Sequence, residues 1–463
     1  MVAYAKITAA LVLASCLALP GLAQKETPPP GGQPKNFVLP AQQTFSLDNG
    51  LAVTLVQYGD VPKVTVELAL RTGNIDEAAA EVWLADLTGE LMKEGTTTRS
   101  ARELAGQAAA MGGQINVSVG PDQTTVSGDA LSDFAAAVVE LVADVALNPR
   151  LPESEIERLK TDQKRNLSIE KSVPQSQALE KFRAVLYHDH PYGRIFPTEA
   201  MIDSYTIDRV RSFYRNHFGA GRSRLYVAGR FDPAAVEQAI RTHFGAWEKG
   251  SAPVGNVPSP SSSRRVYLLD RPGAPQSTLY LGLPVVDPTN PDWTALSVTN
   301  TLLGGFFSSR ITTNIREDKG YTYSPRSSLS VRLRDAYWIE TADVTTEVTG
   351  ASLKEIFYEI DRLQAEAPEE QELQGIKNYL AGTFVVQNSQ RDGIIGQLSY
   401  IDLHGLGIDY LNGYVQRVMA VSPQQVQEMA QKYLRDQDMT IVVVGDKSKV
   451  TGQLAGYGDL VSN

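Results

Sequence analysis

The 463-residue sequence predicts an α+β fold with two domains, each a mixed, largely antiparallel sheet that helices cover on one face. Segments with a strand pattern and segments with a helix pattern follow one another in a similar order in the two halves of the chain. Between the halves, residues 251–263 contain several prolines and a run of serines, which is typical of a linker. These observations place the two domains at residues 45–250 and 264–463.

Each element is predicted from its hydrophobic period. Short runs rich in β-branched and other apolar residues indicate strands, and apolar residues recurring every three to four positions indicate helices. The predicted strands are residues 51–56, 64–70, 123–128, 223–227, 265–269, 277–283 and 439–444. The predicted helices are residues 79–93, 131–147, 293–303 and 350–365.

Composition and charge exclude several classes of protein. The formal net charge of −10 leaves no basic surface of the kind that binds nucleic acid. With Cys16 as its single cysteine, the chain cannot build a zinc site from cysteines. If Cys16 is removed with a leader, the mature chain also has no cysteine nucleophile. Stability must then come from apolar cores rather than disulfides, which a chain of this length permits.

The N-terminus has the pattern of a secretory signal peptide over residues 1–23. One lysine, Lys6, precedes a largely apolar run at residues 7–19, which is too short for a membrane span. The surroundings of Cys16 also resemble a lipoprotein cleavage site, so lipidation is an alternative to ordinary cleavage. A proline-rich arm follows over residues 24–44. In either case we expect an exported protein.

A glycine bend and the helix after it carry the most chemical information. Gly304-Gly305 precede a helix predicted to start at Ser308 and to carry Arg316 on its last turn. Tyr323 follows seven residues later and is expected on the next strand. If both side chains faced one cavity, a guanidinium and a phenol could donate hydrogen bonds to a carbonyl or an oxyanion.

This block closely resembles the C-terminal half of the insulinase/pitrilysin family of zinc metallopeptidases, in its bacterial, processing-peptidase-like branch. The resemblance implies that Arg316 and Tyr323 help to hold the substrate. It also implies that the bend, with Gly304, Gly305, Phe306 and Ser308, binds substrate. The alternative, that Arg316 merely pairs with Glu317 and Tyr323 fills a strand face, remains open.

The N-terminal half resembles the same family without its zinc motif. The family's zinc helix reads H-x-x-E-H, with two histidine ligands on one face and a glutamate as general base. Here Asp86 and Glu90 stand at the histidine positions, Gly89 stands at the base position, and Asn166 falls about where the third ligand should be. We therefore expect no metal site and no zinc-dependent hydrolysis from this chain alone. The alternative is that Asp86, Glu90 and Asn166 hold a metal other than zinc.

The resemblance therefore implies a subunit rather than a complete enzyme. In that branch one subunit holds zinc, and a paralogous subunit without the zinc motif supplies the Arg/Tyr pair. We expect a non-catalytic, substrate-binding subunit of a heterodimeric zinc metallopeptidase in the periplasm of a Gram-negative bacterium. Its partner would bear the zinc motif and the zinc, its substrates would be peptides, and it would touch a membrane only through a lipidated Cys16. The alternative is an exported pseudopeptidase that acts as a peptide-binding or assembly scaffold.

Overall fold

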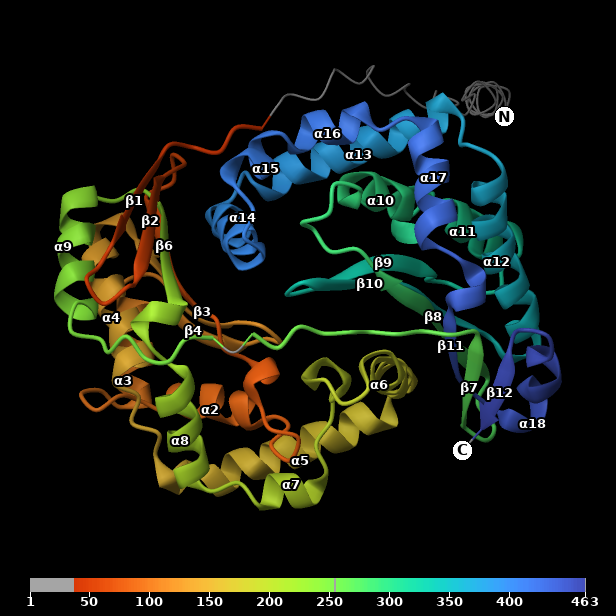
Figure 1. The fold of residues 1–463 in the computed structure, drawn as a ribbon. Coiled ribbons are helices and arrows are strands. Elements are labelled where there is room, and N and C mark those ends of the chain that lie inside the picture. The colour runs from red at the N-terminus through yellow and green to blue at the C-terminus, as the bar shows by residue number, and fades with distance from the viewer. Residues whose placement is uncertain (1–36, 254, 463) are drawn as a thin grey trace, which may run out of the picture. The chain divides into compact units, whose positions relative to one another are not determined.

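The computed structural model describes residues 37–253 and 255–462, and Figure 1 shows its two sheets. The predicted signal peptide, Cys16 and most of the proline-rich arm lie outside the described residues. Among the helices that are described, none combines the length and the apolar character needed to cross a membrane.

The first sheet is six-stranded, in the order β1-β2-β6-β3-β5-β4. Its strands are β1 (Gln42–Ser46), β2 (Ala52–Gln57), β3 (Lys63–Leu70), β4 (Ile115–Val119), β5 (Thr124–Leu131) and β6 (Ser223–Gly229). Only β2 and β6 pair in parallel; every other neighbouring pair is antiparallel. Since β1 starts at Gln42, this sheet begins slightly before residue 45, where the first domain was predicted to start.

The second sheet repeats this arrangement with the order β12-β7-β11-β8-β10-β9. Its strands are β7 (Arg265–Asp270), β8 (Gln276–Val285), β9 (Arg326–Arg332), β10 (Asp335–Thr345), β11 (Thr440–Gly445) and β12 (Asp459–Ser462). The inner order β7-β11-β8-β10-β9 matches β2-β6-β3-β5-β4 of the first sheet. The outermost strand differs, because β1 precedes its sheet in the chain whereas β12 is the last strand described. The predicted α+β class with two mixed sheets is confirmed.

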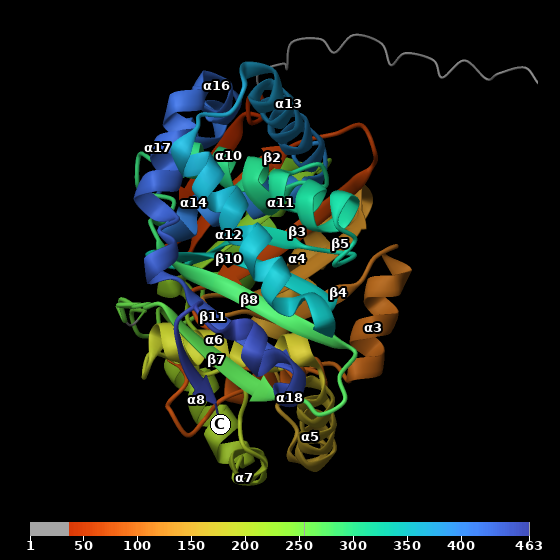
Figure 2. The same ribbon diagram turned by 90° about the vertical axis from the view of Figure 1, so that its right-hand side faces the viewer.

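Helices cover one face of each sheet, and the apolar cores lie between the two layers. The first half contains α2 (Leu84–Met92), α3 (Ala101–Ala110), α4 (Ala135–Leu147), α5 (Ile156–Ser172), α6 (Pro174–Tyr187), α7 (Glu199–Asp203), α8 (Ile207–His217) and α9 (Pro233–Phe244). The second half contains α10 (Trp293–Asn300), α11 (Arg310–Thr312), α12 (Thr349–Ala365), α13 (Glu370–Gln387), α14 (Arg391–His404), α15 (Ile408–Asn412), α16 (Tyr414–Ala420), α17 (Pro423–Tyr433) and α18 (Lys447–Val450). Figure 2 shows α12 in front of β8 and β10, where its apolar stripe meets the sheet.

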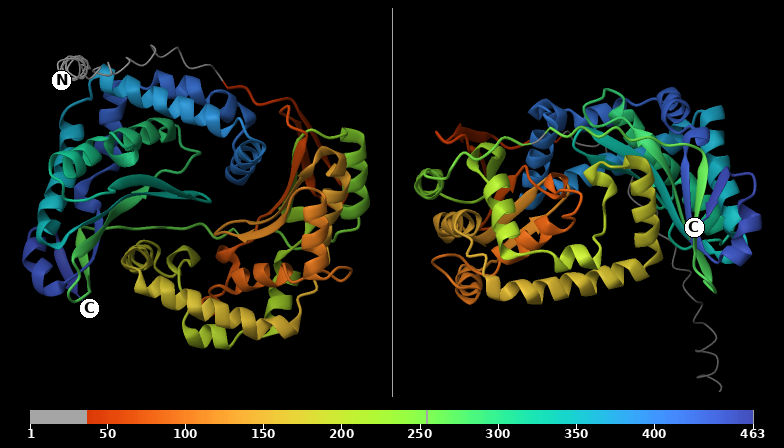
Figure 3. Two further views of the ribbon diagram at one scale, coloured as in Figure 1. Left: turned by 180° about the vertical axis from the view of Figure 1, so that it is seen from behind. Right: turned by 60° about the horizontal axis from the view of Figure 1, so that its bottom comes forward.

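The opposite face of each sheet receives a helix from the other half of the chain, which the prediction of one-sided coverage did not include. Helix α6 of the first half packs on the second sheet, where Phe182 is fully buried against Gly282. Helix α14 of the second half packs on the first sheet, and Tyr226 of β6 donates a hydrogen bond to Asp402 at 2.6 Å. Figure 3 shows both helices from behind. This exchange ties the two halves together through apolar contacts.

Candidate functional site

Arg316 and Tyr323 lie side by side. The guanidinium carbon of Arg316 is 4.8 Å from the centre of the Tyr323 ring and 4.4 Å from the centre of the Phe307 ring. Tyr323 is 80 % exposed and Phe307 is 60 % exposed. The guanidinium thus contacts two exposed aromatic rings in a cation–π arrangement. Phe307 was not identified from the sequence, although its place directly after the glycine bend was a usable signal.

The pairing of Arg316 with Glu317, considered above as the alternative, is also present. Nε of Arg316 is 3.0 Å from a carboxylate oxygen of Glu317, whose side chain is more than half exposed. Such an exposed ion pair contributes about 1 kcal/mol or less. A ligand with a carbonyl or carboxylate could therefore displace it at small cost. The second part of the alternative is wrong, because the exposed ring of Tyr323 fills no strand face.

Tyr323 lies in a loop before β9, so its predicted place on a strand is wrong. The loop is anchored just before the tyrosine. Thr322 forms an isolated bridge with Val344, and its hydroxyl donates a hydrogen bond to the Asp343 carbonyl at 2.7 Å. Gly320, at φ +66°, supplies the left-handed turn that ends the preceding helix. The backbone beside Tyr323 is thus held while its side chain stays free to meet a ligand.

One π-helical segment contains the two glycines of the bend, and a second contains Arg316. Thr301–Gly305 and Thr313–Asp318 are π-helices, and α-helix is confined to Arg310–Thr312 between them. The predicted helix start at Ser308 is thus two residues early. Single π-turns occur frequently at functional sites. Here they widen the helical turn that carries Arg316 beside Phe307.

The bend needs its two glycines for close packing. A Cβ atom on Gly304 would lie 2.6 Å from Oγ of Ser327 and 2.7 Å from Oε2 of Glu340. A Cβ atom on Gly305 would lie 2.8 Å from Nδ2 of Asn300. Glu340 is fully buried, both of its carboxyl oxygens lack a hydrogen-bond partner among the described side chains, and burial raises its pKa well above the usual value. The Glu340 side chain thus packs directly beneath the bend.

The other predicted residues of the bend have structural contacts of their own. The ring of Phe306 packs against the ring of Tyr379, with centroids 4.3 Å apart. Ser308 lines a separate cavity beside α12, which it shares with Arg310 and several carboxylates. Gly304, Gly305 and Phe306 therefore support the loop that presents Phe307.

Asp86, Glu90 and Asn166, which stand at the positions of the absent zinc ligands, line one cavity of about 640 Å³. Within the described ranges, no group of three or more His, Cys, Asp or Glu side chains is arranged to hold a metal ion. Glu90 instead pairs with Lys93 at 2.7 Å, one helical turn further on.

Asp86 has a second buried carboxyl beside it, Glu77, which sequence analysis did not single out. Nδ2 of Asn74 donates to both, at 2.7 Å to Asp86 and 3.2 Å to Glu77. Glu77 also accepts the backbone N–H of Ala85 at 2.9 Å and so caps the start of α2. Burial and then the charge of Asp86 raise the pKa of Glu77 to about 8. Burial likewise raises the pKa of Asp86.

The position of the general base is closely packed. A Cβ atom on Gly89 would lie 2.6 Å from Cγ2 of Val119 on β4, and Val117 stands behind it at 3.6 Å. A larger side chain at this position would require the Val119 side chain to shift.

Both halves of the chain match models of one peptidase family. Residues 53–197 match the insulinase model (peptidase family M16), and residues 204–380 match the model of the peptidase M16 inactive domain. An uncharacterized zinc protease of Mycobacterium tuberculosis is 28 % identical over 363 residues, which covers 77 % of this chain and 80 % of that protein. An uncharacterized zinc protease of Bacillus subtilis is 25 % identical over 282 residues, covering 60 % of this chain and 68 % of that protein.

Solved structures agree with this fold. A peptidase M16 inactive domain from Pseudomonas fluorescens superposes with a TM-score of 0.82 at 23 % identity, covering 88 % of this chain and 98 % of that one. A protease from Helicobacter pylori gives the same TM-score at 19 % identity, covering 88 % of this chain and all of that one. At these identities the likeness shows the fold alone.

Proposed function

This chain belongs to the insulinase family of peptidases (M16), and we propose that it is a non-catalytic, substrate-binding subunit whose Arg316 and Tyr323 serve the zinc site of a partner. The single observation that carries the proposal is the exposed contact between these two side chains. The altered zinc helix supports it, because Gly89 carries no carboxyl group that could act as a general base. The partner would be a paralogous subunit with an intact zinc motif.

Arg316 and Tyr323 would act on the substrate carbonyl. The interaction of Arg316 with Glu317 occupies Nε, so the two terminal nitrogens can donate to a peptide carbonyl. The phenol of Tyr323 would donate to the oxyanion that forms when the partner's zinc-bound water attacks. Removing one donor of this kind costs about 3 to 4 kcal/mol, or a factor of about 10² to 10³ in kcat.

Reconstitution with a zinc-motif partner tests the proposal. The chain, mixed with such a partner encoded in the same genome, should give peptide cleavage that neither protein shows alone. Arg316→Ala should reduce the cleavage rate about 100-fold, and Arg316→Lys should recover only part of it because lysine lacks the planar fork. Unchanged cleavage with Arg316→Ala would contradict the assigned role. Only the partner should need zinc. After treatment with a chelator, reloading the partner with zinc before mixing should restore cleavage.

The scaffold alternative makes a different prediction. A pseudopeptidase scaffold would bind peptides or assemble a complex, yet Arg316→Ala would leave the rate of any associated peptidase unchanged. We place the mature protein in the periplasm, or on a membrane if Cys16 is lipidated. Fractionation of the cells, with and without Cys16→Ala, distinguishes these two locations.

A further inference from the structure

The cavity over α2 is lined by acidic, amide and aromatic side chains. Its volume is about 640 Å³. Asp86 and Glu90 come from α2, and Trp83 directly precedes that helix. Gln163 comes from α5, and Phe196 comes from the segment before α7.

Three polar side chains of the cavity offer oxygen acceptors to a ligand. Gln163 is only 7 % exposed; its Nε2 donates to the Trp83 carbonyl at 3.0 Å, and its Oε1 is buried without a partner among the described side chains. Asp86 accepts from Asn74 and forms no ion pair with any described lysine or arginine. Glu90 has one partner, Lys93, whose side chain is itself 38 % exposed and can be replaced.

The basic residues of the cavity are already committed to other carboxylates. Arg158 pairs with Glu94 and with Glu155, the latter at 2.8 Å. Arg165 pairs with Asp162 at 3.0 Å. Neither guanidinium compensates the charge of Asp86, so the cavity keeps an excess of negative charge near its buried carboxylate. A buried charge without a partner is unfavourable, and a cationic ligand would relieve it.

Two aromatic rings complete the site. Trp83 and Phe196 form an edge-to-face pair with ring centroids 6.0 Å apart, and both line the cavity. Trp83 sits at φ +70°, a left-handed conformation that is uncommon for a bulky residue and places it directly before α2. Aromatic faces attract ammonium and guanidinium groups, with tryptophan the strongest of the three aromatic types.

We propose that this cavity binds an organic cation, the ammonium or guanidinium group of a peptide, between the Trp83–Phe196 pair and the oxygen atoms of Asp86, Glu90 and Gln163. A guanidinium or ammonium group brings several N–H donors together with a positive charge that Asp86 and Glu90 attract. A neutral group lacks that charge, and an anionic group is repelled. The site would select peptides with a basic side chain or a free N-terminus. It needs neither a partner subunit nor a metal, so it is independent of the function proposed for Arg316.

Calorimetric titration of the isolated chain tests this with defined probes. Acetyl-Gly-Arg-Gly amide should bind at least ten times more tightly than the same peptide with citrulline, which has nearly the same shape without the charge. A free-amine Gly-Gly-Gly amide, compared with its acetylated form, shows whether an N-terminal ammonium binds as well. Equal binding of the arginine and citrulline peptides would overturn the proposal.

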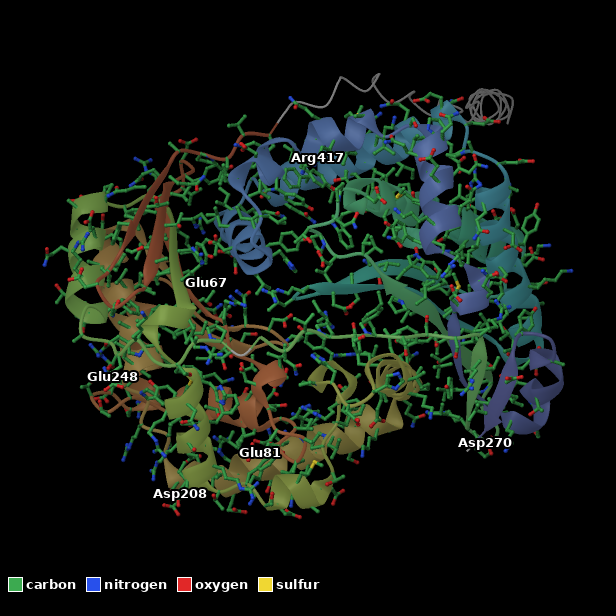
Figure 4. The ribbon with its side chains drawn as sticks, viewed as in Figure 1. Glu67, Glu81, Asp208, Glu248, Asp270 and Arg417 are labelled. Atoms are coloured by element: carbon green, nitrogen blue, oxygen red, sulfur yellow. The ribbon has the colours of Figure 1, made fainter. Side chains whose placement is uncertain are left out.

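Substitutions then locate the binding. Glu90→Gln and Asp86→Asn should each weaken the arginine peptide at least fivefold while leaving the citrulline peptide unchanged. Glu90 is half exposed, so Glu90→Gln should fold normally. This variant keeps the test valid even if Asp86→Asn fails to fold. Asp208→Asn makes the same change of net charge at the outer edge of the first half, where Figure 4 shows the side chain, and should have no effect. Equal loss with Asp208→Asn would contradict a specific site.

Discussion

Gly89 on α2 and Val119 on β4 are in such close contact that a single added carbon on the glycine would come within 2.6 Å of the valine side chain. The contact involves a methyl group of Val119, so a larger side chain on Gly89 would require this valine to shift.

Gly89→Ala should destabilise the protein by about 1 to 3 kcal/mol, because overpacking at a helix–strand contact displaces both elements. Gly106→Ala is the matched control: Gly106 lies in α3, and a Cβ atom there meets nothing within 4 Å. The control should gain about 0.5 to 1 kcal/mol from better helix propensity. Urea denaturation of the two variants measures both changes, and equal values would show that the contact with Val119 is unimportant.

Tyr323→Phe should lower kcat of the reconstituted complex by about 100- to 1,000-fold with little change in KM, because the hydroxyl is proposed to donate only to the transition state. The melting temperature should not change, since the ring is 80 % exposed. Tyr358→Phe removes another exposed hydroxyl on α12 and should leave the rate unaltered. A lower melting temperature without a loss of kcat would assign Tyr323 a structural role instead.

Glu77 makes the free energy of unfolding fall as pH rises from about 4.5 to about 8. Its pKa is about 8 in the folded protein and 4.5 in the reference state, so in this window the folded state holds a proton that the unfolded state has lost. Glu67 and Asp335, with pKa values raised to about 7 and about 6, chiefly by burial, act in the same direction.

Glu77→Gln should flatten this decline without abolishing it, because glutamine can still accept the Ala85 N–H and carries no charge. Each unit of pKa difference corresponds to about 1.4 kcal/mol. Urea denaturation at pH 5, 6, 7 and 8 measures the slope. Glu248→Gln, an exposed residue at the surface shown in Figure 4, should leave the slope as it is in the native protein. An unchanged slope in Glu77→Gln would place the titrating group elsewhere.

The sequence was sufficient for features that depend on short-range patterns. The bounds of buried strands such as β6 and β11 were predicted within a few residues. Short apolar runs of this kind are compatible with few structures other than a buried strand. The positions of Arg316 and Tyr323 followed from their spacing around a glycine cap. The place of Tyr323 on a strand was wrong, since Thr322 bridges to Val344 outside the regular ladder.

Features set by packing between distant segments were not accessible from the sequence. The close approach of Gly304 to Glu340, which lies 36 residues later in the chain, is one example. An amphipathic pattern likewise predicts a helix, but it does not say which sheet the helix covers. For this reason α6 and α14 could not be assigned to the sheet of the opposite half.

Phe182→Ala should destabilise the protein by about 3 to 5 kcal/mol, because this ring of α6 is fully buried where the first half contacts the second sheet. Its loss leaves a cavity beside Gly282 and Tyr337, and the ring contact with Tyr337, 5.5 Å between centroids, disappears. We expect denaturant unfolding to change from one transition to two, since this contact couples the halves. Phe134→Ala, at a partly exposed ring before α4, should cost much less and keep a single transition. A single transition in Phe182→Ala would show instead that α14 alone is enough to couple the two sheets.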